Sequence, residues 1–292
     1  MDSLIKGALI ANVASLGFHW IYDASYIKTI AQKEAILFKP QNPVHYQNAK
    51  EAYLGYADLE VGALSMQGNV LKWLYDALNE NPDFNQADYR ALLFEKLKPG
   101  GQYVGYVESY ANKMISKTIL NTFNVDVSSY PKDDDHLIGL MPYFVFKAYG
   151  KKKEEAFELV KLFSENTDYL RLFEMFDHLF DALKHNHSLQ EALKKSIAYA
   201  PSTLSPLLKS GIQLSDTAAF VKQYQLVACS IYEAIPIVYH LAYHAKSYEQ
   251  AIYDNMLIGG NLSDRGAVLG AILSALYPVN ERWIKKANLK PL

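Results

Sequence analysis

Apolar residues recur at steps of three and four along most of the 292-residue chain, which is the period of amphipathic helices. Strict alternation of apolar and polar residues is nearly absent, so the pattern predicts an all-α protein. Residues 201–215 interrupt it, and we expect a loop there with a short helical turn at 206–208. The expected helices cover residues 4–17, 61–78, 84–96, 106–120, 136–149, 153–164, 169–184, 189–198, 217–243 (kinked at Pro236), 248–257 and 263–276.

The chain shows no boundary between domains. No glycine- or serine-rich linker and no shift of composition divides it, so we predict one domain over residues 1–292. No repeat of fixed period is visible, which argues against a solenoid. Half of the residues are apolar, enough for a sizeable core.

Charge and cysteine content narrow the classes of partner. A net charge of −2 and a pI near 6.5 give no reason to expect nucleic acid. The single cysteine, Cys229, excludes an internal disulfide and fits a reducing compartment, and a buried core thiol is its default role. Without a run of about 18 apolar residues or a secretory signal, we expect a cytoplasmic protein with no membrane partner. Nothing in the sequence indicates an oligomeric state.

A glycine pair at 259–260 opens a short polar turn that leads into an apolar helix. Glycines let the backbone approach a ligand closely, and a helix N-terminus favours an anion. Asn261, Ser263 and Asp264 offer oxygen atoms, and Arg265 offers a guanidinium fork for phosphate or carboxylate. A structural interpretation is equally open, with Asn261 or Ser263 as the helix N-cap and Asp264 stabilised by the helix dipole.

A second cluster follows the first predicted helix and brings His19, Trp20, Tyr22 and Asp23 together. An imidazole, two large rings and a carboxylate could form part of a binding site, with Asp23 or His19 performing acid–base work. The alternative is a packed corner in which Asp23 caps a helix that begins near Ala24. The sequence leaves both interpretations open.

Three adjacent carboxylates, at residues 133–135, precede the helix predicted at 136–149. These carboxylates repel one another, so cations could neutralise them, and Asp134 is then a candidate for acid–base work. Alternatively, they are solvated and stabilise the N-terminus of the helix. The sequence contains no serine–histidine–aspartate order, phosphate-binding glycine loop or zinc-ligand spacing.

In order and spacing, several segments resemble the ADP-ribosylglycohydrolase superfamily, most closely the branch that contains the J-type crystallins. The resemblance covers nearly the whole chain and implies an all-helical single domain with a central cleft. In catalytic members it implies two magnesium ions that hold the ribose of an ADP-ribosyl group and activate water. The similar segments are residues 7–12, 19–23, 103–107, 133–137, 233–236, 254–261, 265–266 and 281–283.

The resemblance and the three clusters together give the candidate site residues. The expected catalytic residues are Asp23, Asp134 and Asp264, and the expected ligand-binding residues are His19, Trp20, Tyr22, Tyr103, Gly259, Gly260, Asn261 and Arg265.

The magnesium ligands that the resemblance implies are largely missing. Met66 and Gln67 stand where it places the first pair of aspartates, and Asn261 and Ser263 stand where it places the second pair. Thioether, hydroxyl and amide groups do not replace carboxylates around magnesium. Asp264 is left as a weak metal ligand, and we expect no tight Mg²⁺ binding.

Three functions stay open. The first is a hydrolase that cleaves an ADP-ribosyl or related N- or O-glycosyl bond in a small molecule or an ADP-ribosylated substrate. The second is a catalytically inactive relative that binds a nucleotide-like ligand or a protein, and the lost carboxylates favour it. The third is a structural, crystallin-like role. The glycine turn and the 19–23 motif favour a surviving pocket over a purely structural role.

Overall fold

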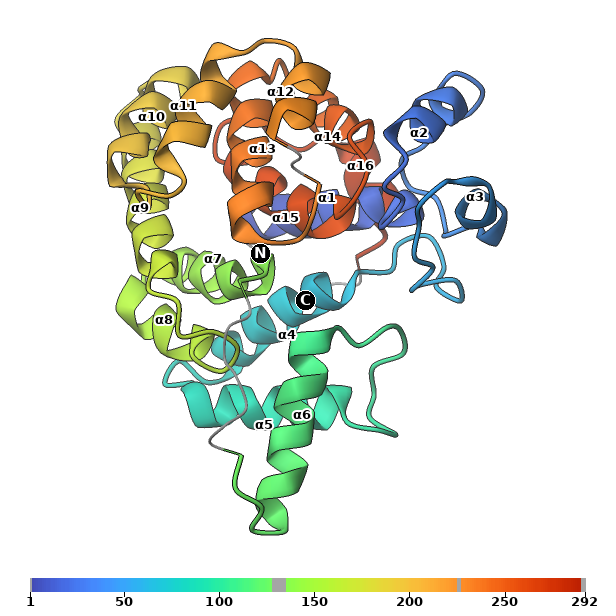
Figure 1. Cartoon of the computed structure of the whole chain (residues 1–292). Coiled ribbons are helices and arrows are strands. Elements are labelled where there is room, and N and C mark those ends of the chain that lie inside the picture. Colours follow the sequence, from blue (N-terminus) through green and yellow to red (C-terminus); the bar gives the residue numbers. More distant parts are fainter. Residues whose placement is uncertain (1, 128–134, 225–226, 290–292) are drawn as a thin grey trace.

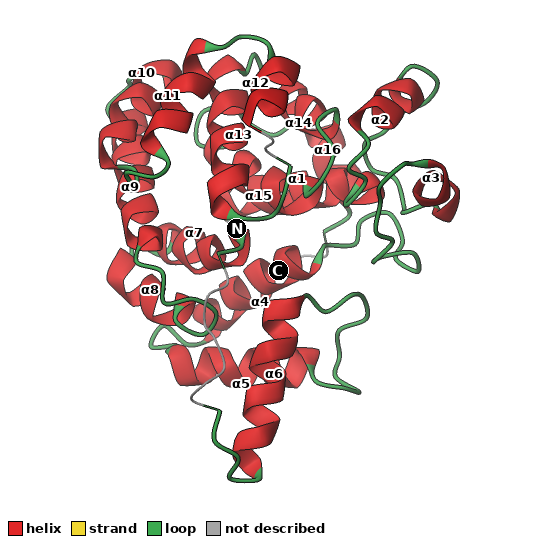
Figure 2. Ribbon diagram, viewed as in Figure 1, coloured by secondary structure: helices red, strands yellow, loops and turns green. Residues whose placement is uncertain are grey.

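The computed structural model describes residues 2–127, 135–224 and 227–289. Over these residues the chain is helical, and strand-like pairing is confined to isolated bridges (Figure 2). The prediction of an all-α fold is confirmed. None of the helices in the described ranges has both the length and the apolar character needed to cross a membrane.

The helices are given in chain order. The first half contains α1 (Ser3–Ser15), η1 (Leu16–Phe18), α2 (Ala24–Ala31), α3 (Pro43–Asn48), α4 (Met66–Glu80), α5 (Gln86–Leu97), α6 (Ser109–Thr122), η2 (Leu137–Gly139) and α7 (Leu140–Ala148). The second half contains α8 (Lys153–Val160), α9 (Asp168–Lys184), α10 (Leu189–Ser196), η3 (Ile197–Tyr199), α11 (Ser205–Gln213), α12 (Thr217–Tyr224), α13 (Ile231–His244), α14 (Tyr248–Met256), α15 (Leu262–Leu273) and α16 (Glu281–Ala287).

Helices α1 and α15 lie side by side at the centre of the fold (Figure 1). Both are buried on nearly every face, which is typical of a helix at the middle of a larger core. Two glycines allow the close approach: a Cβ on Gly7 would lie 2.6 Å from the carbonyl oxygen of Gly270, and a Cβ on Gly270 would lie 2.5 Å from that of Gly7. The N-terminal helix is thereby fixed against the helix that follows the glycine turn.

The remaining helices surround this central pair. Helices α4, α7, α13 and α14 pack against it and share one large apolar core. A smaller core lies beneath α2 and α3, where Phe18, Ile21 and Ile27 meet Met256 and Leu262. Figure 1 shows α2 and α3 at one edge of the molecule and α5 and α6 at another. The segment that links α1 to α2 therefore runs from the centre to the edge.

Helix boundaries differ from the prediction where capping overrides the apolar pattern. Helix α4 begins at Met66 and not at residue 61, because Ser65 is its N-cap and accepts the N–H of Gly68. The helix predicted over 217–243 is divided, because Ser230 caps α13 by accepting the N–H of Tyr232. Pro236 lies inside α13.

Three helices were not predicted. Helix α11 occupies part of the segment expected to be a loop, with Pro206 in its first turn, where the missing proline N–H is not needed. Helices α3 and α16 are short, of six and seven residues, and their caps, Asn42 and Asn280, are the main local signals. Segments of this length carry too few apolar positions to establish a helical period.

Candidate functional site

The turn at residues 17–23 is joined to the glycine pair through the backbone. Gly260 donates its N–H to the carbonyl of Ile21 at 2.7 Å and accepts the N–H of Trp20 at 2.9 Å. Gly259 and Gly260 have left-handed φ values of +80° and +77°. A Cβ on Gly260 would overlap the carbonyl oxygen of Val227. The glycines thus serve close packing of backbone on backbone, which draws three distant segments together.

Trp20 is held in a strained conformation at the centre of this junction. Its φ is +68°, a region that bulky side chains rarely adopt. The indole stacks on the His19 ring with centroids 4.6 Å apart, and it meets the edge of Tyr106 at 5.2 Å. Such strain persists only where the surroundings fix it, and it concentrates at functional sites.

A buried hydrogen-bond network connects α1, α4 and α15. Ser65 donates its hydroxyl to Asp264 Oδ1 at 2.6 Å and accepts from the Asn12 amide at 2.8 Å. The N–H of Ser65 in turn donates to Asn12 Oδ1 at 2.9 Å. All three side chains are fully buried. One oxygen of the Asp264 carboxyl therefore has a hydrogen-bond donor within the protein.

The other oxygen of Asp264 faces His19. His19 Nδ1 accepts the N–H of Ser263 at 3.0 Å, so the proton of the neutral ring lies on Nε2, 3.8 Å from Asp264 Oδ2. Burial, and then the charge of Arg265, lower the pKa of His19 to about 3. Burial raises the pKa of Asp264 to about 7, against the opposing effect of the Ser65 hydrogen bond. Below neutral pH this pair consists of a protonated carboxyl and a neutral imidazole.

Asn261 lies beside this pair and is also fully buried. Its amide is near enough to lower the pKa of Asp264, although no hydrogen bond of normal length and angle joins the two groups. A buried amide with unsatisfied atoms is costly unless water or a ligand meets it.

Arg265 stabilises the glycine turn from within. Its Nε donates to Asn255 Oδ1 at 2.6 Å and its terminal nitrogen donates to the Gly259 carbonyl at 2.9 Å. Burial lowers the pKa of Arg265 to about 9, which keeps the guanidinium charged at neutral pH. The side chain is completely buried, so these contacts give it a role in positioning the turn.

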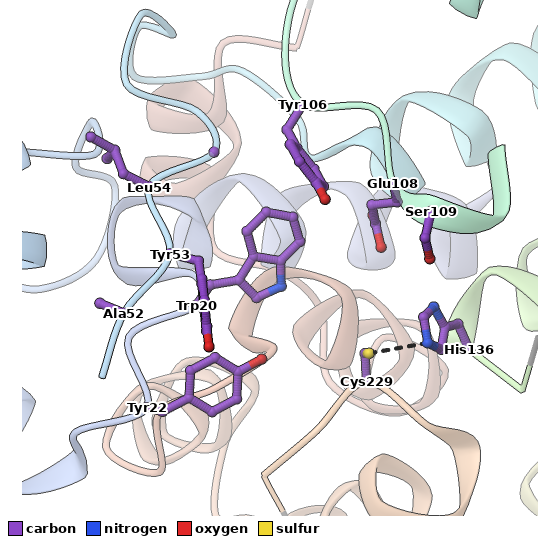
Figure 3. A pocket seen from close by; sticks show the side chains of 11 residues that line it. Trp20, Tyr22, Ala52, Tyr53, Leu54, Tyr106, Glu108, Ser109, His136 and Cys229 are labelled. Carbon is purple, nitrogen blue, oxygen red and sulfur yellow. Dashed lines mark hydrogen bonds between the residues drawn. The ribbon is translucent and has the colours of Figure 1, made fainter. Parts of the chain in front are cut away.

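An open pocket lies in front of the buried cluster. Its volume is about 520 Å³, within the usual range for small-molecule sites. Aromatic rings from three segments form one side, and a polar group of side chains forms the other (Figure 3). The lining residues are Trp20, Tyr22, Ala52, Tyr53, Leu54, Gly55, Tyr106, Glu108, Ser109, His136 and Cys229.

The polar side of the pocket holds a thiol and an imidazole in contact. Cys229 Sγ lies 3.4 Å from His136 Nε2, and both residues are half-buried (Figure 3). Glu108 and Ser109, at the start of α6, lie above His136 on the same side of the pocket in this view. The Glu108 carboxylate accepts from the Gln67 amide at 3.4 Å.

The predicted ligand-binding residues are distributed over three places. Trp20 and Tyr22 line the pocket. His19 and Asn261 lie buried behind it with Asp264. Tyr103 lines a neighbouring hollow together with Trp73, and the two rings meet edge to face with centroids 5.9 Å apart.

The predicted acidic residues are separated from one another. Asp23 caps α2, as the structural alternative held: it accepts from the N–H of Tyr26 at 3.0 Å and from Ser25 Oγ at 2.6 Å. The Ser25 hydroxyl and then the Tyr26 N–H lower the pKa of Asp23. Asp134 lies outside the described residues. A catalytic role for either stays a prediction.

Uncharged side chains surround Asp264 at the positions where the resemblance places magnesium ligands. Met66 and Gln67 occupy the start of α4, and the Met66 sulfur accepts the N–H of Glu108 at 3.3 Å. Within the described ranges, no group of three or more histidine, cysteine, aspartate or glutamate side chains converges as a metal site. Magnesium prefers several oxygen ligands in an octahedral arrangement, and the absence of tight Mg²⁺ binding stays a prediction.

Four residues of the polar side were missed by sequence reasoning. Glu108 and Ser109 stand at an ordinary helix start, and His136 follows an acidic run that drew attention for its carboxylates. Cys229 was expected to be a buried core thiol, but it is half-buried and lines the pocket. Its position next to the α13 N-cap, Ser230, is the one local signal in the sequence.

An aromatic pocket beside buried polar groups is a typical setting for a small-molecule site. Residues 139–290, from α7 to beyond α16, match the model of the ADP-ribosylglycohydrolase family. The match covers more than half of the chain, and the chain belongs to this family. A search of curated proteins found no match.

Proposed function

We propose that the protein binds an ADP-ribosyl compound or a related N- or O-glycoside in the aromatic pocket, and that it does so without a two-magnesium centre. Family membership supports the ligand class. The pocket of about 520 Å³ is open and has aromatic walls, whereas Asp264 is fully buried and accepts a hydrogen bond from Ser65. This separation of pocket and buried carboxyl is the main observation behind the proposal.

The walls of the pocket suit a flat, polar ligand. The indole of Trp20 and the phenol of Tyr106 stand nearly at right angles to each other. The rings of Tyr22 and Tyr53 are also nearly perpendicular, with centroids 5.9 Å apart. Aromatic faces of this kind stack on planar rings such as a nucleobase. Tyr53 and Tyr106 are 61% and 49% exposed, so their faces are accessible to a ligand.

The chemistry of Asp264 argues against metal-dependent cleavage. Burial raises the pKa of Asp264 to about 7, so a metal ion would compete with a proton for this carboxyl near neutral pH, and the Ser65 hydroxyl already donates to one of its oxygens. Glu108 is the nearest alternative among the pocket-lining residues, and the Gln67 amide already contacts it. These contacts support binding without metal-assisted turnover.

The test is the melting temperature of the protein with ADP-ribose in the presence of a chelator. We expect ADP-ribose to raise the melting temperature. At a ligand concentration of a hundred times Kd, the free energy of unfolding should increase by about 2.7 kcal/mol. Tyr106→Ala should abolish the shift, and Phe123→Ala, which removes an exposed ring outside the pocket, should leave it intact. Absence of any shift in the wild-type protein would favour the structural, crystallin-like role.

Hydrolysis of the glycosyl bond is the second candidate, because Glu108 places a carboxylate on the pocket wall. A carboxyl group at this position could serve as general acid or base. Release of ADP-ribose from ADP-ribosyl-arginine and ADP-ribosyl-serine tests it, with and without chelator. Chelator-sensitive turnover that is lost in Asp264→Ala would instead show that a metal centre forms.

A further inference from the structure

The thiol and the imidazole of the pocket are held together by a rigid backbone contact. His136 and Ser230 form an isolated antiparallel bridge. On either side of it, Leu137 donates its N–H to the Cys229 carbonyl at 3.3 Å, and Ile231 donates to Asp135 at 2.8 Å. The backbone thus holds the two residues side by side, and Cys229 Sγ lies 3.4 Å from His136 Nε2.

One further contact fixes the backbone of His136, and another packs against its ring. Tyr169 donates its hydroxyl to the His136 carbonyl at 2.7 Å, and the Tyr110 ring meets the His136 ring edge to face with centroids 5.4 Å apart. An oriented base within hydrogen-bond reach of a thiol is the arrangement that activates a cysteine nucleophile.

The position of Cys229 in the fold favours a thiolate. It directly precedes Ser230, the N-cap of the 14-residue helix α13, whose positive end stabilises a nearby anion. Glu233, in the first turn of α13, opposes this effect in part, but its carboxylate is engaged by the N–H groups of Val227 and Ala228 at 3.1 and 2.8 Å.

We propose that Cys229 and His136 form a nucleophilic thiol–imidazole pair that accepts the acyl group of a carboxylic ester bound in the pocket. The ester carries a flat ring, because the opposite wall is built from Trp20 and Tyr22. This inference rests on the pocket and its thiol, not on the preference for ADP-ribosyl compounds.

The reaction balances with water as the only co-reactant. His136 Nε2 takes the thiol proton, Sγ bonds to the ester carbonyl carbon, and the bond from that carbon to the alkoxy oxygen breaks. The departing alcohol receives the proton from His136. Water then adds to the thioester, the carbon–sulfur bond breaks, and the products are a carboxylic acid, an alcohol and the original thiol.

Tyr22 is placed to assist the tetrahedral intermediate. Its hydroxyl points into the pocket (Figure 3). Burial, and then the charge of Cys229, raise the pKa of Tyr22 well above its usual range, so it stays a hydrogen-bond donor at neutral pH. A donor of this kind stabilises negative charge that develops on a carbonyl oxygen.

The first experiment measures how fast iodoacetamide alkylates the protein at pH 7 with a chelator present. Cys229 is the only cysteine, so every adduct reports on it. We expect the folded chain to react at least about threefold faster than the urea-unfolded chain, and His136→Gln to lose that advantage. His187→Gln, a change at a half-buried histidine outside the pocket, should keep this rate advantage.

The second experiment offers p-nitrophenyl acetate, an ester with a flat ring. We expect a burst of p-nitrophenolate and one acetyl group per chain mapped to Cys229, with neither in Cys229→Ser. If iodoacetamide alkylates Cys229 more slowly in the folded chain than in the unfolded chain, the proposal that His136 activates Cys229 is wrong. Rapid alkylation without an acetyl adduct would overturn the assignment to esters. Both outcomes are independent of whether ADP-ribose raises the melting temperature.

Discussion

The His19–Asp264 pair makes a prediction about stability and pH that is specific to its buried geometry. In the folded protein the pair holds one proton between about pH 4 and pH 6.5, on Asp264, because burial moves the two pKa values to about 3 and about 7. In the unfolded chain the pair also holds one proton over this range, on His19. The proton counts are equal, so the pair adds no pH dependence to the wild-type free energy of unfolding.

The substitution Asp264→Asn makes the number of bound protons differ between the folded and unfolded states. The folded variant then holds no proton at the pair, whereas His19 in the unfolded chain still binds one below its ordinary pKa of 6.5. Since the unfolded state binds more protons, stability rises with pH, by about 1.4 kcal/mol per pH unit. Relative to the wild type, the variant should therefore gain about 2 kcal/mol between about pH 4.5 and pH 6.

His19→Gln should produce the opposite slope. Burial still raises the pKa of Asp264, so the folded variant keeps a proton that the unfolded chain loses near the ordinary pKa of 3.8. The folded state then binds more protons, and stability falls as pH rises toward 7. The two variants differ in sign although they alter the same contact.

Urea unfolding at several pH values measures these slopes. Each variant is compared with the wild-type protein at the same pH, so that titrations elsewhere cancel. Opposite slopes for Asp264→Asn and His19→Gln are the expected result. Free energies of unfolding that run parallel to the wild type for both variants would refute the assignment of a protonated carboxyl beside a neutral imidazole.

The remaining predictions concern residues that support the site and the effect of magnesium on stability. Gly260→Ala should lower the free energy of unfolding by about 3 kcal/mol, because φ is +77° and a Cβ meets the Val227 carbonyl. Gly100→Ala, with φ of +76° and open space around it, should cost only about 1 kcal/mol in the same urea titration. Ser65→Ala should cost about 2 kcal/mol, since it removes the α4 cap and the hydrogen bond to Asp264. Magnesium and chelator should both leave the wild-type melting temperature unchanged, as followed by calorimetry.

The helical part of the fold was predictable because its signals are local. The apolar period gives the long helices, and Asp23 in front of α2 is a capping residue that the sequence offered as one of two interpretations. The start of α4 was misplaced, because the apolar residues at 61 and 64 extend the period past Ser65. There, one hydrogen bond from the Gly68 N–H to Ser65 decides where the helix begins.

The candidate site was only partly predictable because it depends on contacts between distant residues. Trp20 and Tyr22 were identified from a compact motif and line the pocket. His136 and Cys229 are 93 positions apart, and a single backbone bridge brings them together. No periodicity or motif encodes such a bridge, so neither residue could be paired from the sequence.

The separation between buried centre and open pocket determines where chemistry can occur in this protein. A metal ion at Asp264 would have to displace its proton and the Ser65 hydroxyl, at a position that no solvent reaches. The charged guanidinium of Arg265 is engaged elsewhere, by Asn255 and the Gly259 carbonyl. On the pocket wall, by contrast, His136 and Cys229 are half-buried and reachable by a ligand. We therefore expect the pair at the centre to support the fold, and we expect any reaction to involve the side chains of the pocket wall.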